Sequence, residues 1–332
     1  MRRLATFAVL ACAALALVTP AVGADLPPLR IGNGERLLVV APHPDDETLG
    51  AGGLIQRVRA RGGTVQILVV TAGDGWVDAV RRETGSKNPP PSQYVAYGEK
   101  RLQEVRSAAL ELGQNNLHLQ ILGFPDGGLD GLLGPNWERS EPQRSRTTGA
   151  SDPPYEEARD PDLPYAGTDL RQEMEQILQD FNPTLVALPD PQDRHPDHRA
   201  AGLFTLLAID DWSKGPGAGQ PWPRLLSYLV HWPAWPPGWD AVQSRPEDAH
   251  APLDLPADYH LNDAAKVALP LNDREIARKR AALAEHKTQN EVMGPCLGAF
   301  VRRTEPFILL SPDDVQRAEY VVAERLRTTR SR

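Results

Sequence analysis

The segment from Ala41 to Glu47, which reads Ala-Pro-His-Pro-Asp-Asp-Glu, constrains the fold of this chain more than any other segment. It follows an apolar run at residues 37–40 that predicts a short buried strand. It precedes residues 48–60, whose small and apolar side chains favour a helix packed against a sheet. One imidazole and three carboxylates would therefore lie at the carboxyl end of a strand, where open α/β sheets bind their ligands. Because adjacent carboxylates repel each other unless a proton or a cation lies between them, the segment predicts a divalent metal site.

A second predicted strand, at residues 183–188, also ends in potential ligands. The residues that follow it, 190–199, read Asp-Pro-Gln-Asp-Arg-His-Pro-Asp-His-Arg. His195 and His198 are three residues apart at the start of a predicted helix, so both imidazoles can approach one point. The two strand-end segments together hold enough ligands for one metal ion.

The combination of His43, Asp46 and His198 would give two histidines and one carboxylate, with open positions for water and substrate. Three protein ligands are typical of catalytic zinc sites, whereas structural zinc sites usually have four. The same donor set also suits Fe²⁺.

These two motifs resemble those of the LmbE-like (PIG-L superfamily) de-N-acetylases, zinc hydrolases that remove acyl groups, usually acetyl, from amino sugars. Further segments match that family in order, with Thr288 in place of a serine: Val70–Asp74, Arg101–Gly113, Gly123–Gly128 and Lys279–Gln289. The resemblance covers most of the chain after residue 24. It implies a Rossmann-like, doubly wound, mostly parallel sheet with helices on both faces and long active-site loops.

The resemblance also implies a role for each residue of the two motifs. His43, Asp46 and His198 would ligate zinc, and Asp45 would be the general base that takes a proton from water and delivers it to the departing amine. His195 would stabilise the oxyanion, most usefully as an imidazolium.

Four other positions match family residues around the site. Asp197 would orient a histidine, and Asp74, Arg101 and Asp126 would bind sugar hydroxyls. Simpler interpretations remain open for two of them. Asp126 could serve only to form the Pro-Asp-Gly-Gly turn, and Arg101 could be a solvated partner of Glu104.

Simpler interpretations also exist for three neighbouring groups. Asp46 could cap the helix that follows it, and Glu47 has a favourable charge in the first turn of that helix without any catalytic role. His286 could be a cation near a helix carboxyl end.

Residues 1–24 are predicted to be a secretory signal peptide, because two arginines precede an apolar run and small residues precede a cleavage site after Ala24. Cys12 lies too early in the run to predict a lipoprotein anchor. Removal of this segment would leave Cys296 as the only cysteine, which excludes an intrachain disulfide. The predicted location is periplasmic or extracellular.

The remaining residues, 25–332, are expected to form one domain with loop elaborations at 131–167 and 232–256. Without residues 1–24 the chain has a net charge of −10, which disfavours binding to nucleic acid. No later apolar run is long enough to span a membrane, and no partner other than a small-molecule or glycan substrate is predicted. Strands are expected near 36–41, 65–71, 117–122, 184–188 and 225–231, and helices near 46–61, 94–113, 168–181, 196–208 and 312–327.

Three tryptophans, Trp232, Trp235 and Trp239, lie in a proline-rich stretch. They could form a platform that stacks on sugar rings, but a hydrophobic plug that holds the loop to the domain is the favoured interpretation.

Other functions fit the sequence less well. A dinucleotide-binding oxidoreductase would use a similar sheet, but Gly50–Gly53 is only a fragment of the glycine fingerprint and follows three acids. A zinc metalloprotease would need an H-E-x-x-H motif, which this chain does not contain. A non-catalytic carbohydrate-binding relative would have lost the base or a ligand, and both are present here. We therefore expect an exported N-deacetylase for an N-acetylglucosamine-type group, with an amidase for a non-sugar amide as the alternative.

Overall fold

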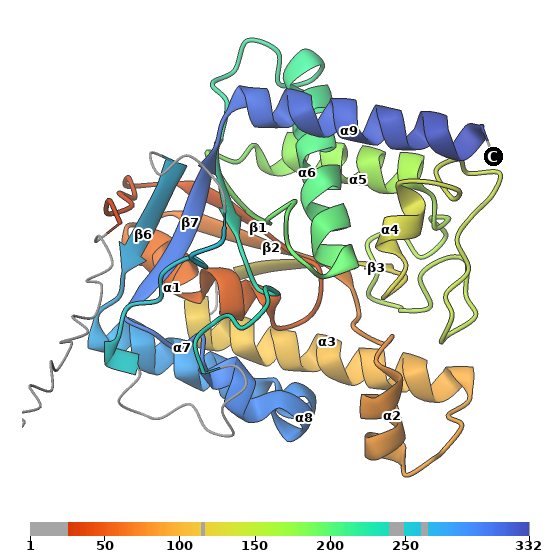
Figure 1. Ribbon diagram of the computed structural model, residues 1–332, viewed down its shortest axis with the longest axis horizontal. Helices are drawn as coiled ribbons and strands as arrows, with labels where there is room; N and C mark the ends of the chain where they lie inside the picture. Colours follow the sequence, from red (N-terminus) through yellow and green to blue (C-terminus); the bar gives the residue numbers. More distant parts are fainter. Residues whose placement is uncertain (1–25, 114–116, 239–248, 260–264, 332) are drawn as a thin grey trace, which may run out of the picture.

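A computed structural model describes residues 26–113, 117–238, 249–259 and 265–331 of the chain. Its centre is a seven-stranded sheet with the order β3-β2-β1-β4-β5-β7-β6 (Figure 1). The strands are β1 (Arg36–Ala41), β2 (Thr64–Thr71), β3 (Leu117–Phe124), β4 (Leu185–Pro189), β5 (Arg224–Tyr228), β6 (Lys266–Pro270) and β7 (Thr304–Leu310). The predicted signal segment lies outside the described residues.

Nine helices surround this sheet in the part of the chain that the structure describes. They are α1 (Asp46–Ala60), α2 (Val77–Thr84), α3 (Pro91–Gly113), α4 (Leu129–Leu132), α5 (Gly167–Phe181), α6 (Pro196–Lys214), α7 (Asp273–Glu285), α8 (Lys287–Gly298) and α9 (Pro312–Arg330). None of the described helices is both long and apolar enough to cross a membrane.

The strands β1 to β5 are parallel and have the doubly wound order 3-2-1-4-5, so the predicted fold class is confirmed. The strands β7 and β6 extend the sheet in antiparallel fashion beyond β5. The sequence did not predict these two strands, because proline at Pro270 and Pro306 is unusual inside a sheet and weakens the strand signal.

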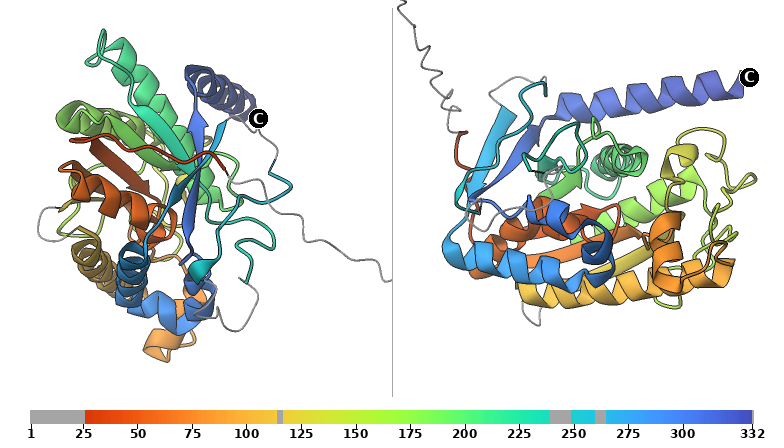
Figure 2. Two further views of the ribbon diagram at one scale, coloured as in Figure 1. Left: turned by 90° about the vertical axis from the view of Figure 1, so that its left-hand side faces the viewer. Right: turned by 60° about the horizontal axis from the view of Figure 1, so that its bottom comes forward.

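Helices cover both faces of the sheet, as Figures 1 and 2 show. In β1, Leu37 and Val39 belong to the core shared with α1, α3 and α7. Leu38 and Val40 belong to the core shared with α5, α6 and α9. A strand that is buried on both faces needs a continuous apolar run, and residues 37–40 provide it.

The strand order reverses between β1 and β4, and ligands of such sheets bind in the crevice outside the strand ends at this point. The two predicted metal motifs leave the sheet at this switch point, where one opens α1 and the other opens α6. In α1, a Cβ atom at Gly50 would lie 2.2 Å from the ring of Tyr228. The glycines after the first motif therefore allow close packing of α1 on β5.

Several predicted boundaries differ from the structure; for example, the helix expected near 196–208 extends to Lys214. The family-like segment 279–289 spans two helices in the structure, because His286 ends α7 and precedes α8. Strand β5 ends at Tyr228 rather than at residue 231, so His231 lies in the loop that follows the strand.

Candidate active site

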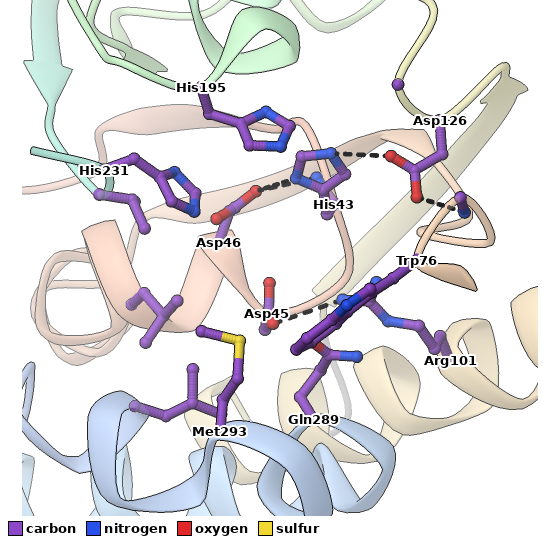
Figure 3. A pocket seen from close by; sticks show the side chains of 15 residues that line it. His43, Asp45, Asp46, Trp76, Arg101, Asp126, His195, His231, Gln289 and Met293 are labelled. Carbon is purple, nitrogen blue, oxygen red and sulfur yellow. Dashed lines mark hydrogen bonds and ion pairs between the residues drawn. The ribbon is translucent and has the colours of Figure 1, made fainter. Parts of the chain in front are cut away.

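A pocket of about 400 Å³ lies over the carboxyl ends of the parallel strands (Figure 3). The loops after β1 to β5, together with α1, α3 and α8, supply its lining: His43, Asp45, Asp46, Leu49, Gly75, Trp76, Arg101, Asp126, Gly127, His195, Val230, His231, Gln289, Met293 and Leu297.

Three predicted ligand atoms converge at the bottom of this pocket. The Oδ2 atom of Asp46 lies 3.1 Å from Nδ1 of His43 and 3.1 Å from Nε2 of His198. Ligand bonds of about 2.0–2.1 Å in a tetrahedral arrangement put neighbouring ligand atoms roughly 3.3 Å apart. Both spacings are those of neighbouring ligands of one small cation, with Asp46 between the two histidines.

The side chain of His198 gives an independent test of this interpretation. It is fully buried, and neither ring nitrogen has a hydrogen-bond partner among the described residues. These nitrogens instead face the carboxylates of Asp46 and Asp193, at 3.1 and 3.5 Å, without the alignment of a hydrogen bond. A cation bound by both Nε2 and Asp46 would satisfy the two facing atoms. The residues therefore fit a metal ion. Ring nitrogens of His43, His195 and His198 also lie within 4.8 Å of one another, so His195 borders the same point.

The other face of His43 is held by two carboxylates. Its Nε2 atom lies 3.2 Å from Asp126 Oδ1 and 3.3 Å from Asp197 Oδ2. Asp197 is fully buried and accepts hydrogen bonds from the backbone N–H groups of Gly127 and Leu129, at 2.7 and 3.1 Å. Asp197 thus holds His43 in a fixed orientation, which is the geometry expected of an outer-shell carboxylate.

The carboxylate of Asp45 lies in the pocket beside these ligands. Burial, with a smaller contribution from the charge of Asp46, raises the pKa of Asp45 to about 7, although Arg101 acts in the opposite direction. The guanidinium of Arg101 lies 3.3 Å from Asp45 Oδ2 and also donates to the carbonyl groups of Pro44 and Gly73.

Arg101 is buried and contacts Asp45, so the alternative interpretation of Arg101 as a solvated partner of Glu104 is wrong. The carboxylate of Glu104 instead accepts hydrogen bonds from the N–H and hydroxyl groups of Thr288.

The structure changes the expected charge of His195. Burial, followed by the nearby His43 and His198, lowers the pKa of His195 to about 2, so this side chain is neutral rather than the expected imidazolium. Its Nδ1 accepts a hydrogen bond of 3.2 Å from the backbone N–H of Asp197. The proton of the neutral ring is therefore on Nε2, where it can be donated to an oxyanion.

The three residues predicted to bind substrate lie in different positions. Asp126 and Arg101 line the pocket. Asp74 is buried, does not line it, and accepts a hydrogen bond from the hydroxyl of Tyr155. Its predicted contact with sugar hydroxyls stays a prediction.

Two residues near the ligands were not assigned by the sequence analysis. Asp193 is fully buried, accepts from the backbone N–H groups of His195, Val230 and His231, and has Oδ2 3.5 Å from His198 Nδ1. The ring of His231 lies 4.4 Å from that of His198, centre to centre. His231 could have been found from its position after β5, because the loop after a strand parallel to β1 and β4 reaches the same edge of the sheet.

Three further residues that line the pocket had no role in the sequence analysis. Trp76 precedes α2, and Gln289 and Met293 lie on α8 (Figure 3). Figure 3 shows Met293 and His231 on one side of Asp45, and Trp76 and Asp126 on the other.

Trp232 and Trp235 of the proline-rich stretch do not line the pocket. Trp232 is 8% exposed and its indole donates to Asp258, while Trp235 is 5% exposed and donates to the carbonyl of Asp254. They form a hydrophobic plug, as favoured above, and not a platform for sugar rings. Trp239 lies outside the described residues.

Comparison with known proteins gives consistent results. The family PIG-L, described as GlcNAc-PI de-N-acetylase, matches residues 38–209. A 1D-myo-inositol 2-acetamido-2-deoxy-alpha-D-glucopyranoside deacetylase from Tsukamurella paurometabola is 30% identical over 289 residues, which are 80% of this chain and 86% of that protein. A diacetylchitobiose deacetylase from Thermococcus kodakarensis is 25% identical over 53% of this chain and 49% of its own.

Among solved structures, a deacetylase of the teicoplanin biosynthesis pathway has a TM-score of 0.51 at 17% identity. The match covers 82% of this chain and 97% of that chain, and it shows a shared fold. The sheet order, the two strand-end motifs and these matches lead to one conclusion: the chain belongs to the PIG-L (LmbE-like) family.

Proposed function

We propose that this protein is an exported zinc-dependent hydrolase that removes the N-acetyl group from an N-acetylglucosamine-type amino sugar. The observation that carries the proposal is the position of Asp45. A buried carboxyl group with a pKa raised to about 7 lies directly beside the Asp46 ligand and faces the pocket. A general base works best when its pKa lies near the working pH.

The residues of the chain have distinct tasks in this reaction. Asp45 takes a proton from the attacking water and then delivers it to the departing amine. Neutral His195 donates a hydrogen bond from its Nε2–H to the oxygen of the amide as negative charge develops there, and keeps its proton. Arg101 restrains the Asp45 carboxylate through their contact of 3.3 Å.

His43, Asp46 and His198 would hold the metal. A divalent cation at this point would supply Lewis-acid polarisation of the amide carbonyl and would lower the pKa of water toward neutrality. Two histidines with one carboxylate favour zinc, and Fe²⁺ is the alternative for the same donors.

The sugar is expected on the side of the pocket that holds Asp126 and Trp76. The Asp126 carboxylate can accept hydrogen bonds from hydroxyl groups, and the half-buried indole of Trp76 offers an apolar face to a sugar ring. The names of the relatives, which are deacetylases of N-acetylglucosamine conjugates, support a substrate of this class. The export part of the proposal rests on the predicted signal peptide at residues 1–24.

The proposal is tested by acetate release from diacetylchitobiose, N-acetylglucosaminyl inositol and N-acetylglucosamine, with N-acetylated amino acids as non-sugar amides. Zinc-loaded protein is expected to release acetate from at least one sugar, and chelator-treated protein from none. Absence of acetate from every acetylated sugar, or turnover that survives complete metal removal, would contradict the proposal.

A further inference from the structure

The backbone of Asp45 is strained. Its φ angle is 132° and its ψ angle is −26°, a region that residues with a side chain rarely adopt. Such a conformation costs on the order of 1–3 kcal/mol and persists only when the surrounding structure enforces it. The Asp45 side chain does not cap α1 but points into the pocket toward Arg101. Some other group must therefore hold this residue in place.

That group is the carboxylate of Glu47. Its Oε2 atom accepts a hydrogen bond of 3.0 Å from the backbone N–H of Asp45. Glu47 is 0% exposed, although a carboxylate in the first turn of a helix is normally stabilised there with its charge in water. The side chain instead turns back over the residue whose backbone is strained.

The second oxygen of Glu47 is also fully engaged. Its Oε1 atom accepts a 2.6 Å bond from the hydroxyl of Thr48 and lies 3.2 Å from Nε2 of His286. His286 is 1% exposed, so the two side chains form a buried pair. A buried carboxylate needs such partners, because an isolated charge away from water is very costly.

His286 connects this pair to the pocket wall. It lies at the junction of α7 and α8, and the next turn of α8 places Gln289 in the pocket lining. Thr288 beside it is bound by Glu104 of α3, which fixes the start of α8. The same pair therefore contacts the backbone of Asp45 on one side and the beginning of α8 on the other.

We propose that Glu47 and His286 are positioning residues, which hold the Asp45 carboxylate at its place in the pocket and fix α8 relative to it. This inference rests on the proposed function in one respect, the assignment of Asp45 as the base. Neither side chain lines the pocket, so neither contacts the substrate.

The chain contains a matched control in Glu305. This carboxylate is 2% exposed and accepts hydrogen bonds from the backbone N–H groups of Gly53 and Leu54 in α1. It also pairs with buried Lys279 at 2.7 Å. Glu305 lies on β7, and its loss removes a buried carboxylate that binds the same helix as Glu47, but about two turns from Asp45.

The experiment compares Glu47→Ala, Glu47→Gln and Glu305→Ala in the full chain, with kcat, KM, bound zinc and Tm measured for each variant. We expect Glu47→Ala to keep its zinc and its KM while kcat falls by about 100-fold, the effect of a displacement near 1 Å. Glu47→Gln should recover most of this loss, because its amide oxygen can still accept the Asp45 N–H. Glu305→Ala should lower Tm to a similar extent and leave kcat unchanged.

If Glu47→Ala does not fold, His286→Ala replaces it in the comparison, because this variant keeps the hydrogen bond from the Asp45 N–H to Glu47. It should lower kcat by about tenfold at unchanged zinc content. The proposal is overturned if Glu47→Ala, or His286→Ala in its place, loses stability as Glu305→Ala does while its kcat is that of the wild type.

Hydrogen exchange separates this inference from the proposed function. In Glu47→Ala, or His286→Ala if that variant is used, the segment 43–48 should exchange faster than in the wild type. In Glu305→Ala, the segment 50–56 should do so. This readout does not depend on the substrate. If the wild type hydrolyses no acetylated sugar, faster exchange at 43–48 still supports the positioning pair, and unchanged exchange there overturns it.

Discussion

The floor of the pocket and its helical wall are built in different ways. The floor consists of His43, Asp45, Asp46, His195 and His198, which lie on the loops after β1 and β4 and in the first turns of α1 and α6. The wall consists of Trp76, Gln289, Met293 and Leu297, which lie beside α2 and on α8 (Figure 3).

Floor groups are held by several specific contacts each. Asp46, for example, accepts from the His43 N–H at 2.9 Å and lies 3.1 Å from two imidazole nitrogens. Wall groups have fewer polar contacts: Gln289 donates to the hydroxyl of Tyr97 at 3.1 Å, and Trp76 and Met293 are half-buried side chains. We infer that the floor fixes the reaction and that the wall determines which substrate fits.

The largest effect is expected from removal of a floor ligand. Asp46→Ala should weaken zinc binding by more than about 100-fold, the upper range for loss of an outer-shell partner, and should abolish acetate release. Metal content after dialysis measures this. Asp210→Asn is the control, because Asp210 belongs to a separate acidic cluster with Asp211 and Glu319. If Asp210→Asn lost the metal and Asp46→Ala kept it, the site would be misplaced.

A smaller loss of zinc affinity is expected from substitution of Asp193, whose carboxylate faces the floor residue His198. Asp193→Asn should lower zinc affinity by about 10- to 100-fold, because the carboxylate that faces His198 Nδ1 at 3.5 Å loses its charge. Competition with a chromogenic chelator measures the affinity. An unchanged affinity would show that Asp193 only holds the loops together.

Asp74, which belongs to neither the floor nor the wall, predicts a dependence of stability on pH. Burial, and secondarily the charge of Asp126, raises the pKa of Asp74 to about 7. The unfolded chain releases the same proton near pH 4, so the native state binds more protons between these values. The resulting contribution to the free energy of unfolding is present below about pH 4 and is lost as the pH rises to about 7, a change of a few kcal/mol.

Asp74→Asn should remove this dependence, because the amide does not titrate and its oxygen can still accept from Tyr155. Urea unfolding at a series of pH values measures the difference between the two proteins. Parallel curves for the wild type and the variant from pH 4 to pH 7 would contradict the raised pKa.

The smallest effect is expected at the wall, on KM alone. Trp76→Ala should raise KM by about 3- to 10-fold through loss of ring contacts, with kcat nearly unchanged. Trp232→Ala is the matched control, since that indole lies in the plug and should affect Tm without affecting KM. A fall in kcat without a change in KM for Trp76→Ala would remove the distinction between floor and wall.

The sequence predicted the floor because its residues follow buried strands directly. The parallel strands β1 and β4 place residues 42–47 and 190–198 side by side at the switch point, so proximity followed from the strand pattern alone. The five parallel strands were also predicted, because each contains a largely apolar run.

The wall could not be predicted in the same way, because α2 and α8 approach the pocket through packing between distant segments. Nothing local in the sequence indicates that Glu104 binds Thr288 or that His286 reaches Glu47. The charge of His195 was also beyond local reasoning, because its pKa is lowered first by burial and then by histidines that include His43 and His231 from the loops after β1 and β5.

The most direct test of the account is the effect of Asp45→Asn on turnover and bound zinc, measured on the same protein sample. Asn has nearly the same size and tolerates a positive φ angle, so the fold and the metal site should be retained. We predict one zinc per chain in both proteins and a fall in kcat of at least about 100-fold in the variant, as expected for loss of a general base. Full activity with zinc bound would contradict the role of Asp45, and a wild-type protein that binds no metal would contradict the site itself.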